Sequence, residues 1–552
     1  MFDLIIRGGR VVDGSGRAAF AADVGINSGR IAAIGALGGD ARTIVDARNR
    51  IVAPGFIDPH THFDVQLLWD GAARPAIEHG VTTVVPGNCS LSLAPLKASD
   101  RRTLVGMFQQ IEELPPAAFT EAFEWSWEGF GGYVDALKRN LSINVAPLVG
   151  HSVIRLWVMG AASQQRSASA GEIAAMQDLL RECLDAGAIG LSTSFVDVDA
   201  DLRPVPSRFA YQSELDALAK VLGEYGRMLQ VVPEFYATDL TIARIDQLAE
   251  LSLKYNIPTT FSPLFDSAAT PDNVPRTMAR VEEQFARGAR VWPQVQTRPI
   301  DISFSFERPS LYFARFPSWY RVMRLPRTER IAALRDATTV ARMVSETGAD
   351  GGRTFMGKLR VRGGEGAPED LAGRTLEDIA DARGETAAQC LINVSLENDL
   401  LVPFLAANVG HQDADRVGPL LAHPHVHVGA SDGGAHVTSF STYGDTGFLF
   451  SRYVRQTRHL TLEQAIRKIT SDTAQIWGIP NRGLLETGRA ADVVVFDAAR
   501  IDRGDEHAVF DMPGHGMRYV RNSIGIDTVV VNGEIAYRDA AYTGSRSGSV
   551  CT

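Results

Sequence analysis

Residues 52–62 read Val-Ala-Pro-Gly-Phe-Ile-Asp-Pro-His-Thr-His. A short apolar run, Phe56-Ile57, leads to two histidines that stand two positions apart, His60 and His62. Side chains at i and i+2 of an extended chain point to the same side. Two imidazoles that leave the end of one strand on one side can bind one divalent metal ion. The stretch therefore predicts a short strand that ends in part of a metal site.

The composition is that of an ordinary globular chain. The 552 residues are 45% hydrophobic and 22% charged, which is enough for a large catalytic domain and a smaller one. A net charge of -10 argues against a nucleic-acid-binding surface, and no apolar run approaches the ~18–20 residues of a membrane span. The four cysteines are too widely spaced to predict a disulfide framework. We expect a cytoplasmic protein with no nucleic-acid or membrane partner.

The two ends of the chain share one pattern. Short alternating segments separated by Gly, Asn and Asp occur in the first fifty residues and again in the last seventy, where Thr528-Val529-Val530-Val531 precedes an Asn-Gly turn. This pattern is typical of antiparallel strands. We predict a small β-sandwich domain that is built from both termini, residues 1–56 and 481–552.

The middle of the chain alternates between apolar strand candidates and helix-like segments such as 213–225, 241–254 and 277–288. The strand candidates are residues 56–57, 81–86, 144–149, 188–193, 229–234, 259–262, 291–295 and 426–432. Eight strands joined by right-handed helical crossovers close naturally into a barrel. We therefore predict an α/β fold, a (β/α)₈ TIM-type barrel over residues 57–480. Residues 300–400 break the rhythm and are predicted to be an insertion.

Catalytic residues of such a barrel lie at the carboxyl ends of the strands. The candidates there, besides the two histidines, are Cys89, His151 and Asp432, with His436 shortly afterwards. Asp432 can take a proton from a metal-bound water and pass it to a leaving nitrogen, or it can be a turn residue. Cys89 is either a metal ligand or a buried spectator, and His151 either contacts substrate or makes a structural hydrogen bond.

Three further histidines, His423, His425 and His427, alternate with other residues just before or within the last strand. Their spacing resembles that of metal ligands. They lie away from the carboxyl end of that strand, however, and we interpret them as structural.

Several motifs together resemble the amidohydrolase superfamily, and within it the N-acyl-D-amino-acid deacylases. The superfamily motifs are residues 52–62 and Gly429-Ala430-Ser431-Asp432-Gly433. Those of the deacylase branch are Pro86-Gly87-Asn88-Cys89, Gly150-His151-Ser152-Val153-Ile154-Arg155, and Thr543-Gly544-Ser545-Arg546-Ser547-Gly548. The resemblance covers nearly the whole chain apart from residues 300–400.

The resemblance implies zinc, a metal-activated water and attack on an amide carbonyl. It implies that His60, His62 and Cys89 are metal ligands and that Asp432 acts as base and then acid. The deacylases also carry one histidine after strand five and another after strand six, where this chain has Glu234 and Ser262. Glu234 is a candidate oxygen ligand, whereas serine binds zinc poorly. We therefore expect a reduced site with one ion, which is zinc, iron or manganese, bound by His60, His62, Asp432 and Glu234.

The sequence predicts a metal-dependent hydrolase of a linear amide in a small molecule, an N-acylated amino acid. Arg298 is a candidate for binding a substrate carboxylate, with a structural salt bridge as its alternative. His151 and His436 are further candidates for substrate contact. One alternative function is hydrolysis of a cyclic amide, imide or lactone. Another is a non-catalytic protein that keeps the fold, and a homo-oligomer is expected in either case.

Overall fold

The computed structural model describes residues 1–268, 270–307, 311–313, 315–363, 366–429 and 431–551. Residue 430, within the predicted strand 426–432, lies outside these ranges. The chain divides into two compact units. The larger unit comprises Met1–Arg298 and Asp413–Thr552, and the smaller one comprises Pro299–Gln412.

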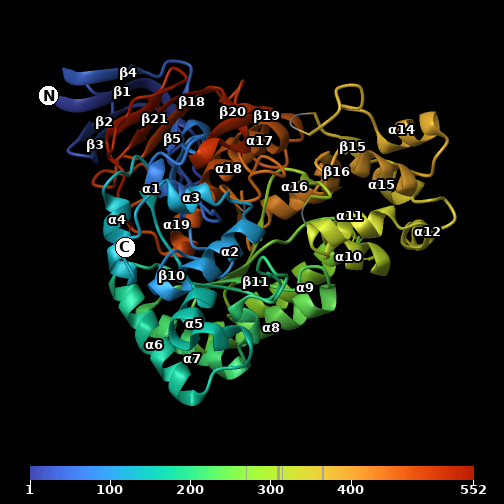
Figure 1. The fold of residues 1–552 in the computed structure, drawn as a ribbon. Helices are drawn as coiled ribbons and strands as arrows, with labels where there is room; N and C mark the ends of the chain where they lie inside the picture. The colour runs from blue at the N-terminus through green and yellow to red at the C-terminus, as the bar shows by residue number, and fades with distance from the viewer. Residues whose placement is uncertain (269, 308–310, 314, 364–365, 430, 552) are drawn as a thin grey trace. The chain divides into compact units, whose positions relative to one another are not determined.

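The two ends of the chain form one nine-stranded sheet in the larger unit, visible as blue and red strands in Figure 1. Its strands are β1 (Phe2–Val11), β2 (Phe20–Asn27), β3 (Arg30–Gly35), β4 (Ala41–Asp46), β5 (Ile51–Pro54), β18 (Val493–Phe496), β21 (Ile526–Val531), β22 (Glu534–Arg538) and β23 (Ala541–Tyr542). Antiparallel pairing of β5 with β18 joins the two ends, with Val52 opposite Val495. Both of these valines are buried, so the junction is part of a hydrophobic core.

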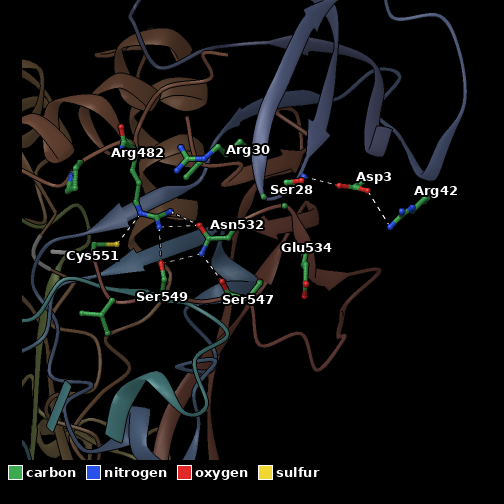
Figure 2. A pocket seen from close by; sticks show the side chains of 16 residues that line it. Asp3, Ser28, Arg30, Arg42, Arg482, Asn532, Glu534, Ser547, Ser549 and Cys551 are labelled. Atoms are coloured by element: carbon green, nitrogen blue, oxygen red, sulfur yellow. Dashed lines mark hydrogen bonds and ion pairs between the residues drawn. The ribbon is translucent and has the colours of Figure 1, made fainter. Parts of the chain in front are cut away.

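The last residues of the chain are anchored beside this sheet. Arg482 donates hydrogen bonds to Asp492, to Ser549 Oγ at 3.1 Å and to Cys551 Sγ at 3.0 Å. Figure 2 shows Arg482 and Ser549 at a polar cavity of about 850 Å³. Val550 also forms a parallel bridge with Val145, which belongs to a strand of the central region. These last residues are therefore held against β8 (Asn144–Val145), a parallel strand that pairs with β7 (Val81–Val84).

Parallel strands make up the centre of the larger unit. They pair in two series, β6-β7-β8 and β9-β10-β11-β12-β13-β17. Their bounds are β6 (Phe56–Asp58), β7 (Val81–Val84), β8 (Asn144–Val145), β9 (Val149–Gly150), β10 (Gly190–Ser194), β11 (Met228–Val232), β12 (Thr259–Phe261), β13 (Val291–Val295) and β17 (His427–Val428). Only three residues separate β8 from β9. A parallel bridge between Thr61 and Gly433 connects the segment after β17 back to the end of β6.

Helices alternate with these strands. They include α2 (Arg101–Ile111), α5 (His151–Met159), α6 (Ala170–Asp185), α7 (Gln212–Tyr225), α8 (Thr238–Tyr255) and α9 (Asn273–Ala286). Helix α6 begins with a capping box, in which Ser169 and Glu172 satisfy each other's backbone N–H groups. In the part of the chain that the structure describes, no helix combines the length and apolarity that a membrane crossing requires.

The smaller unit has its own hydrophobic core. Its three-stranded antiparallel sheet, in the order β14-β16-β15, consists of β14 (Ile300–Phe304), β15 (Arg360–Val361) and β16 (Phe404–Gly410). Its longer helices are α10 (Pro317–Met323), α11 (Arg327–Arg335), α12 (Ala337–Glu346), α14 (Leu376–Arg383) and α15 (Ala387–Glu397). Trp319 is fully buried there and donates from Nε1 to the backbone oxygen of Met343 at 2.7 Å. Aromatic packing of this kind accounts for the Phe-rich composition of the segment.

Candidate metal centre

The end of β6 holds His60 and His62 inside the molecule, where they are 3% and 2% exposed. Thr61 between them points the other way and donates from Oγ1 to the backbone oxygen of Val85 at 3.0 Å. The Nδ1 atom of His60 lies 2.9 Å from Gln294 Oε1 and 3.1 Å from Ser262 Oγ. These contacts fix the ring so that Nε2 faces the centre of the site.

Cys89 approaches the same two imidazoles from the loop that follows β7. Its Sγ atom lies 3.4 Å from His60 Nε2 and 3.7 Å from His62 Nε2. Its backbone φ of 54° is in the left-handed region, which is uncommon for a residue with a side chain. Such strain is retained where the surrounding structure fixes a functional conformation. Gly87, two residues earlier, allows this turn. Only glycine fits at that position, because a Cβ there would collide with the backbone carbonyl of Leu148.

Asp432 reaches the same two nitrogens from the segment after β17. Its Oδ1 atom lies 3.1 Å from His62 Nε2 and 3.6 Å from His60 Nε2. The backbone is again left-handed, with a φ of 65°. Ser431 holds this turn, since its hydroxyl donates to Asp58 at 2.5 Å and accepts from the Gly433 N–H at 2.9 Å.

These donors fit a zinc-type ion. His60, His62 and Cys89 offer ligand atoms that all lie within 4.8 Å of one another. Around one tetrahedral ion, with ligand bonds of about 2.0–2.3 Å, neighbouring ligand atoms are separated by about 3.3–3.6 Å. The distances from the two imidazoles to Cys89 and Asp432 range from 3.1 to 3.7 Å. A thiolate among the donors favours zinc over manganese.

The electrostatics of the pocket also suit a cation. Burial lowers the pKa of His60 to about 4, which keeps its ring neutral with a free lone pair. Burial opposes the charge on His62, but the charge of Glu112 and the hydrogen bond to Asp432 outweigh it and raise the pKa of His62 well above its usual value. Burial raises the pKa of the Cys89 thiol. A positive ion would therefore replace a proton at His62 and favour the thiolate of Cys89.

Two adjacent glutamates after α2 support the site, and neither was among the residues predicted from the sequence. Glu112 Oε1 lies 2.8 Å from His62 Nδ1, on the side of the ring away from Cys89. Glu113 accepts hydrogen bonds from Thr438 Oγ1 at 2.5 Å and from Ser439 Oγ at 2.6 Å. The only sequence signal for them is an acidic pair between a helix and two prolines, which is too common to identify a site.

His436 lies beside Asp432, as expected from its place in the sequence. Its Nε2 atom is 3.5 Å from Asp432 Oδ2, its Nδ1 atom is 3.8 Å from Glu113 Oε1, and its side chain is 37% exposed. Burial disfavours the charged ring, but the neighbouring carboxylates of Glu113 and Asp432 raise the pKa of His436 to about 9. The site thus offers a cationic ring at its accessible side.

Glu234 differs from the sequence expectation, because the structure does not place it among the potential ligands. Arg244 on α8 takes its carboxylate, with Nη2 2.8 Å from Oε1 and Nε 3.4 Å from Oε2. The Glu234 carboxylate is thus held by an ion pair with Arg244, and the group of potential ligand atoms around the histidines contains Cys89 and not Glu234. Ser262, at the corresponding place after β12, is also not a metal ligand. Its hydroxyl is hydrogen-bonded to His60.

His151 and Arg298 also have partners that differ from a substrate. His151 is fully buried, 2.9 Å from Thr193 Oγ1 and 2.7 Å from Glu214 Oε1. Arg298 Nη1 lies 2.5 Å from Asp445 Oδ1, and both side chains are less than 10% exposed. Each of these two side chains is thus paired with a buried carboxylate of the fold.

Comparison with known proteins identifies the family. A profile of the amidohydrolase family matches residues 43–232 and 329–537. The chain belongs to the amidohydrolase family. D-aminoacylase from Alcaligenes xylosoxydans xylosoxydans is 31% identical to this amidohydrolase over 562 residues, which cover 100% of this chain and 97% of that protein.

Two further relatives place it in the branch that was expected from the motifs. N-acyl-D-glutamate deacylase from the same organism is 30% identical and covers 96% of this chain and 93% of its own. A crystal structure of N-acyl-D-glutamate deacylase from Bordetella bronchiseptica, complexed with zinc and a phosphonate mimic of the tetrahedral intermediate, is 29% identical. It superposes with a TM-score of 0.70 over 100% of this chain and 99% of that one. This amidohydrolase therefore has a TIM barrel with an additional domain, and it belongs to the D-aminoacylase-like group.

Proposed function

We propose that this amidohydrolase hydrolyses the amide bond of an N-acyl-D-amino acid, with one zinc ion bound by His60, His62 and Cys89. The observation that carries the proposal is the approach of Cys89 and Asp432 to the same two imidazole nitrogens at 3.1–3.7 Å. The support from relatives is that D-aminoacylase and N-acyl-D-glutamate deacylase match along nearly the whole chain. The support for a single ion is that Glu234 is bound by Arg244 and Ser262 by His60.

Zinc at this place would lower the pKa of a water molecule and polarise the amide carbonyl. Asp432 is positioned to take a proton from the attacking water and to return it to the leaving nitrogen, so that a carboxylate and a free amine are produced. Gln294 and Glu112 keep the rings of His60 and His62 in one orientation from behind. The charged ring of His436 would bind the carboxylate of the amino-acid half, since Arg298 is paired with Asp445.

We also infer the finer architecture that accompanies this function. The parallel strands would close as a (β/α)₈ barrel over residues 57–480, with residues 300–400 as an insertion. Residues 1–56 and 481–552 would form a β-sandwich. The bridge between Thr61 and Gly433 supports closure of the barrel, and the pairing of β5 with β18 supports a single domain built from both ends of the chain.

The test uses the full-length protein, stripped of metal with a chelator and then reloaded with zinc. We expect release of free amino acid from N-acyl-D-amino acids and much slower release from the L-enantiomers. The variants His60→Ala and Asp432→Asn should each lose activity, and His60→Ala should also bind less zinc. His459→Ala, which alters a half-buried histidine paired with Asp415, is the matched control. Equal inertness toward both enantiomers, or hydrolysis of a cyclic amide alone, contradicts the proposal.

A further inference from the structure

A second group of metal-type donors lies outside the candidate catalytic site. Among the described residues, Glu282, His423 and His425 also offer ligand atoms within 4.8 Å of one another. Glu282 is on α9, and the two histidines lie between α16 (Ala414–Ala422) and β17. They precede β17, whereas Asp432 follows it, so the two groups belong to opposite ends of that strand. No part of the proposed reaction uses them.

The carboxylate of Glu282 lies close to both rings. Its Oε1 atom is 2.6 Å from His425 Nδ1 and 3.6 Å from His423 Nε2. These separations are close to the ones that ligand atoms adopt around a shared ion, about 3.3 Å, with the shorter one a direct hydrogen bond at present. Small movements of Glu282 are enough to admit an ion, since its side chain is 45% exposed.

Two contacts hold the rings in place, one from outside the group and one within it. His425 stacks on Phe285 with a centroid distance of 3.8 Å and an interplanar angle of 2°. The backbone N–H of His425 donates to His423 Nδ1 at 3.2 Å. Both histidine side chains remain about a third exposed, at 32% and 33%, so that water and ions can reach them. His425 also lines a cavity of about 830 Å³, which leaves room for further ligands.

His427 shows what a structural histidine looks like in the same segment. It is 1% exposed, and its Nε2 atom accepts a hydrogen bond from Trp477 Nε1 at 2.7 Å. The sequence interpretation as a structural residue describes His427 well. His423 and His425 differ because they are accessible and share one carboxylate.

We propose that Glu282, His423 and His425 bind a second divalent metal ion of the zinc type. Two imidazoles and one carboxylate suit zinc and neighbouring first-row metals, with water in the remaining positions. Binding moves the ring proton of each histidine to the nitrogen that faces away from the ion. At His423 this removes the hydrogen bond from the His425 N–H, because Nδ1 then carries the proton and can no longer accept.

One neighbouring positive charge opposes the ion. Lys468 lies against this segment, but its Nζ atom donates to the backbone oxygens of His423 at 2.7 Å and Val426 at 3.1 Å. The ammonium is thus directed at carbonyl groups and away from the ring nitrogens. We expect weaker binding than at the site with Cys89. The ion would tie α9 to the segment that leads into β17 and stabilise both.

The experiment measures zinc per chain after removal of metal and dialysis against zinc. We expect about two ions in the wild-type protein and about one in His423→Ala/His425→Ala. Glu282→Gln should weaken the affinity for this ion by more than about tenfold, because loss of a direct ligand lowers metal affinity more than loss of a residue that only contacts a ligand. Glu283→Gln, a change at the next residue of the same helix, should have no effect. Equal zinc in the wild type and the double variant overturns the proposal.

The two sites can be separated. In His60→Ala/His62→Ala, zinc should still bind at the second site, and this binding should still require His423 and His425. This expectation holds even if the proposed deacylase activity is not found. If that variant does not fold, cobalt replaces zinc in the wild-type protein. The site with Cys89 gives a sulfur-to-cobalt charge-transfer band, while a sulfur-free site adds only weaker ligand-field bands. His423→Ala/His425→Ala should lose those weaker bands alone, and an unchanged spectrum overturns the proposal.

Discussion

His62 Nδ1 lies 2.8 Å from Glu112 Oε1, and the two side chains are 2% and 1% exposed. The contact is an ion pair, and neither atom has a hydrogen-bond partner in the described part of the chain. A carboxylate behind a metal-binding imidazole fixes the orientation of the ring and increases its basicity. Glu112 is therefore a positioning residue for His62, although nothing in the sequence around it indicates this role.

The first prediction concerns the metal affinity that depends on this pair. Glu112→Gln removes the negative charge and should weaken zinc binding at the proposed catalytic site by about 10–100-fold. Competition with a coloured chelator measures the affinity, in the His423→Ala/His425→Ala background so that only one site contributes. Glu124→Gln changes an exposed glutamate a short distance along the chain and serves as the control. Unchanged affinity in Glu112→Gln would show that the pair is only structural.

The second prediction separates the two interpretations of Arg298. Arg298→Ala leaves Asp445 buried without its cation and should reduce the free energy of unfolding by about 3–5 kcal/mol. The KM of the folded fraction should change little. Denaturant unfolding and steady-state kinetics measure the two quantities. The opposite pattern, a large increase in KM with unchanged stability, would restore Arg298 as the residue that binds the substrate carboxylate.

The alternation of strands and helices was predictable from the sequence, because most of the apolar runs are bounded by Gly or Pro and several are followed by residues at helical spacing. Each of the eight predicted segments overlaps a strand, and the helix predicted at 213–225 is α7, Gln212–Tyr225. The His60 and His62 pair was predictable for the same reason, since the i, i+2 spacing fixes their side. Which strands pair with one another depends on contacts between distant parts of the sequence. A local sequence pattern does not predict these pairings.

Partners across the fold could not be predicted in this way. Glu234 stands at a strand end, as a ligand would, but Arg244 ten residues later binds it. The same strand-end position of His151 does not reveal Glu214, which lies 63 residues away in the sequence and 2.7 Å away in space. Glu112 and Glu282 follow no strand, so the rule that located the other candidates excluded them. A side chain's role depends on the charge that folding places beside it.

The third prediction tests His436 as the group that binds the substrate carboxylate. His436→Asn should raise the KM for an N-acyl-D-amino acid by about tenfold or more, the size expected for a lost charged hydrogen bond of about 1.5–3 kcal/mol. An amide substrate without a carboxylate should be unaffected. Since the pKa of His436 is raised to about 9, the wild-type KM should stay constant at neutral pH and increase as the pH passes that value. An equal effect on both substrates would assign His436 another role.

The fourth prediction concerns stability and pH at His79, a buried residue that belongs to neither proposed metal site. Burial lowers its pKa from 6.5 to about 4, and its Nε2 atom lies 2.8 Å from the backbone oxygen of Arg521. Between these two pKa values the unfolded chain binds a proton at His79 that the folded chain does not. Stability must therefore fall as the pH is lowered through this window.

The expected size follows from the same shift. Between pH 7 and pH 5 the wild-type protein should lose about 2 kcal/mol at His79, because one pKa unit corresponds to about 1.4 kcal/mol. His79→Gln can still donate a hydrogen bond to Arg521 but cannot bind the proton, so its loss over the same range should be smaller by that amount. Urea unfolding of both proteins at the two pH values measures the difference. Parallel losses in the two proteins would mean that His79 is protonated in the folded state and that its burial does not control the acid sensitivity of the fold.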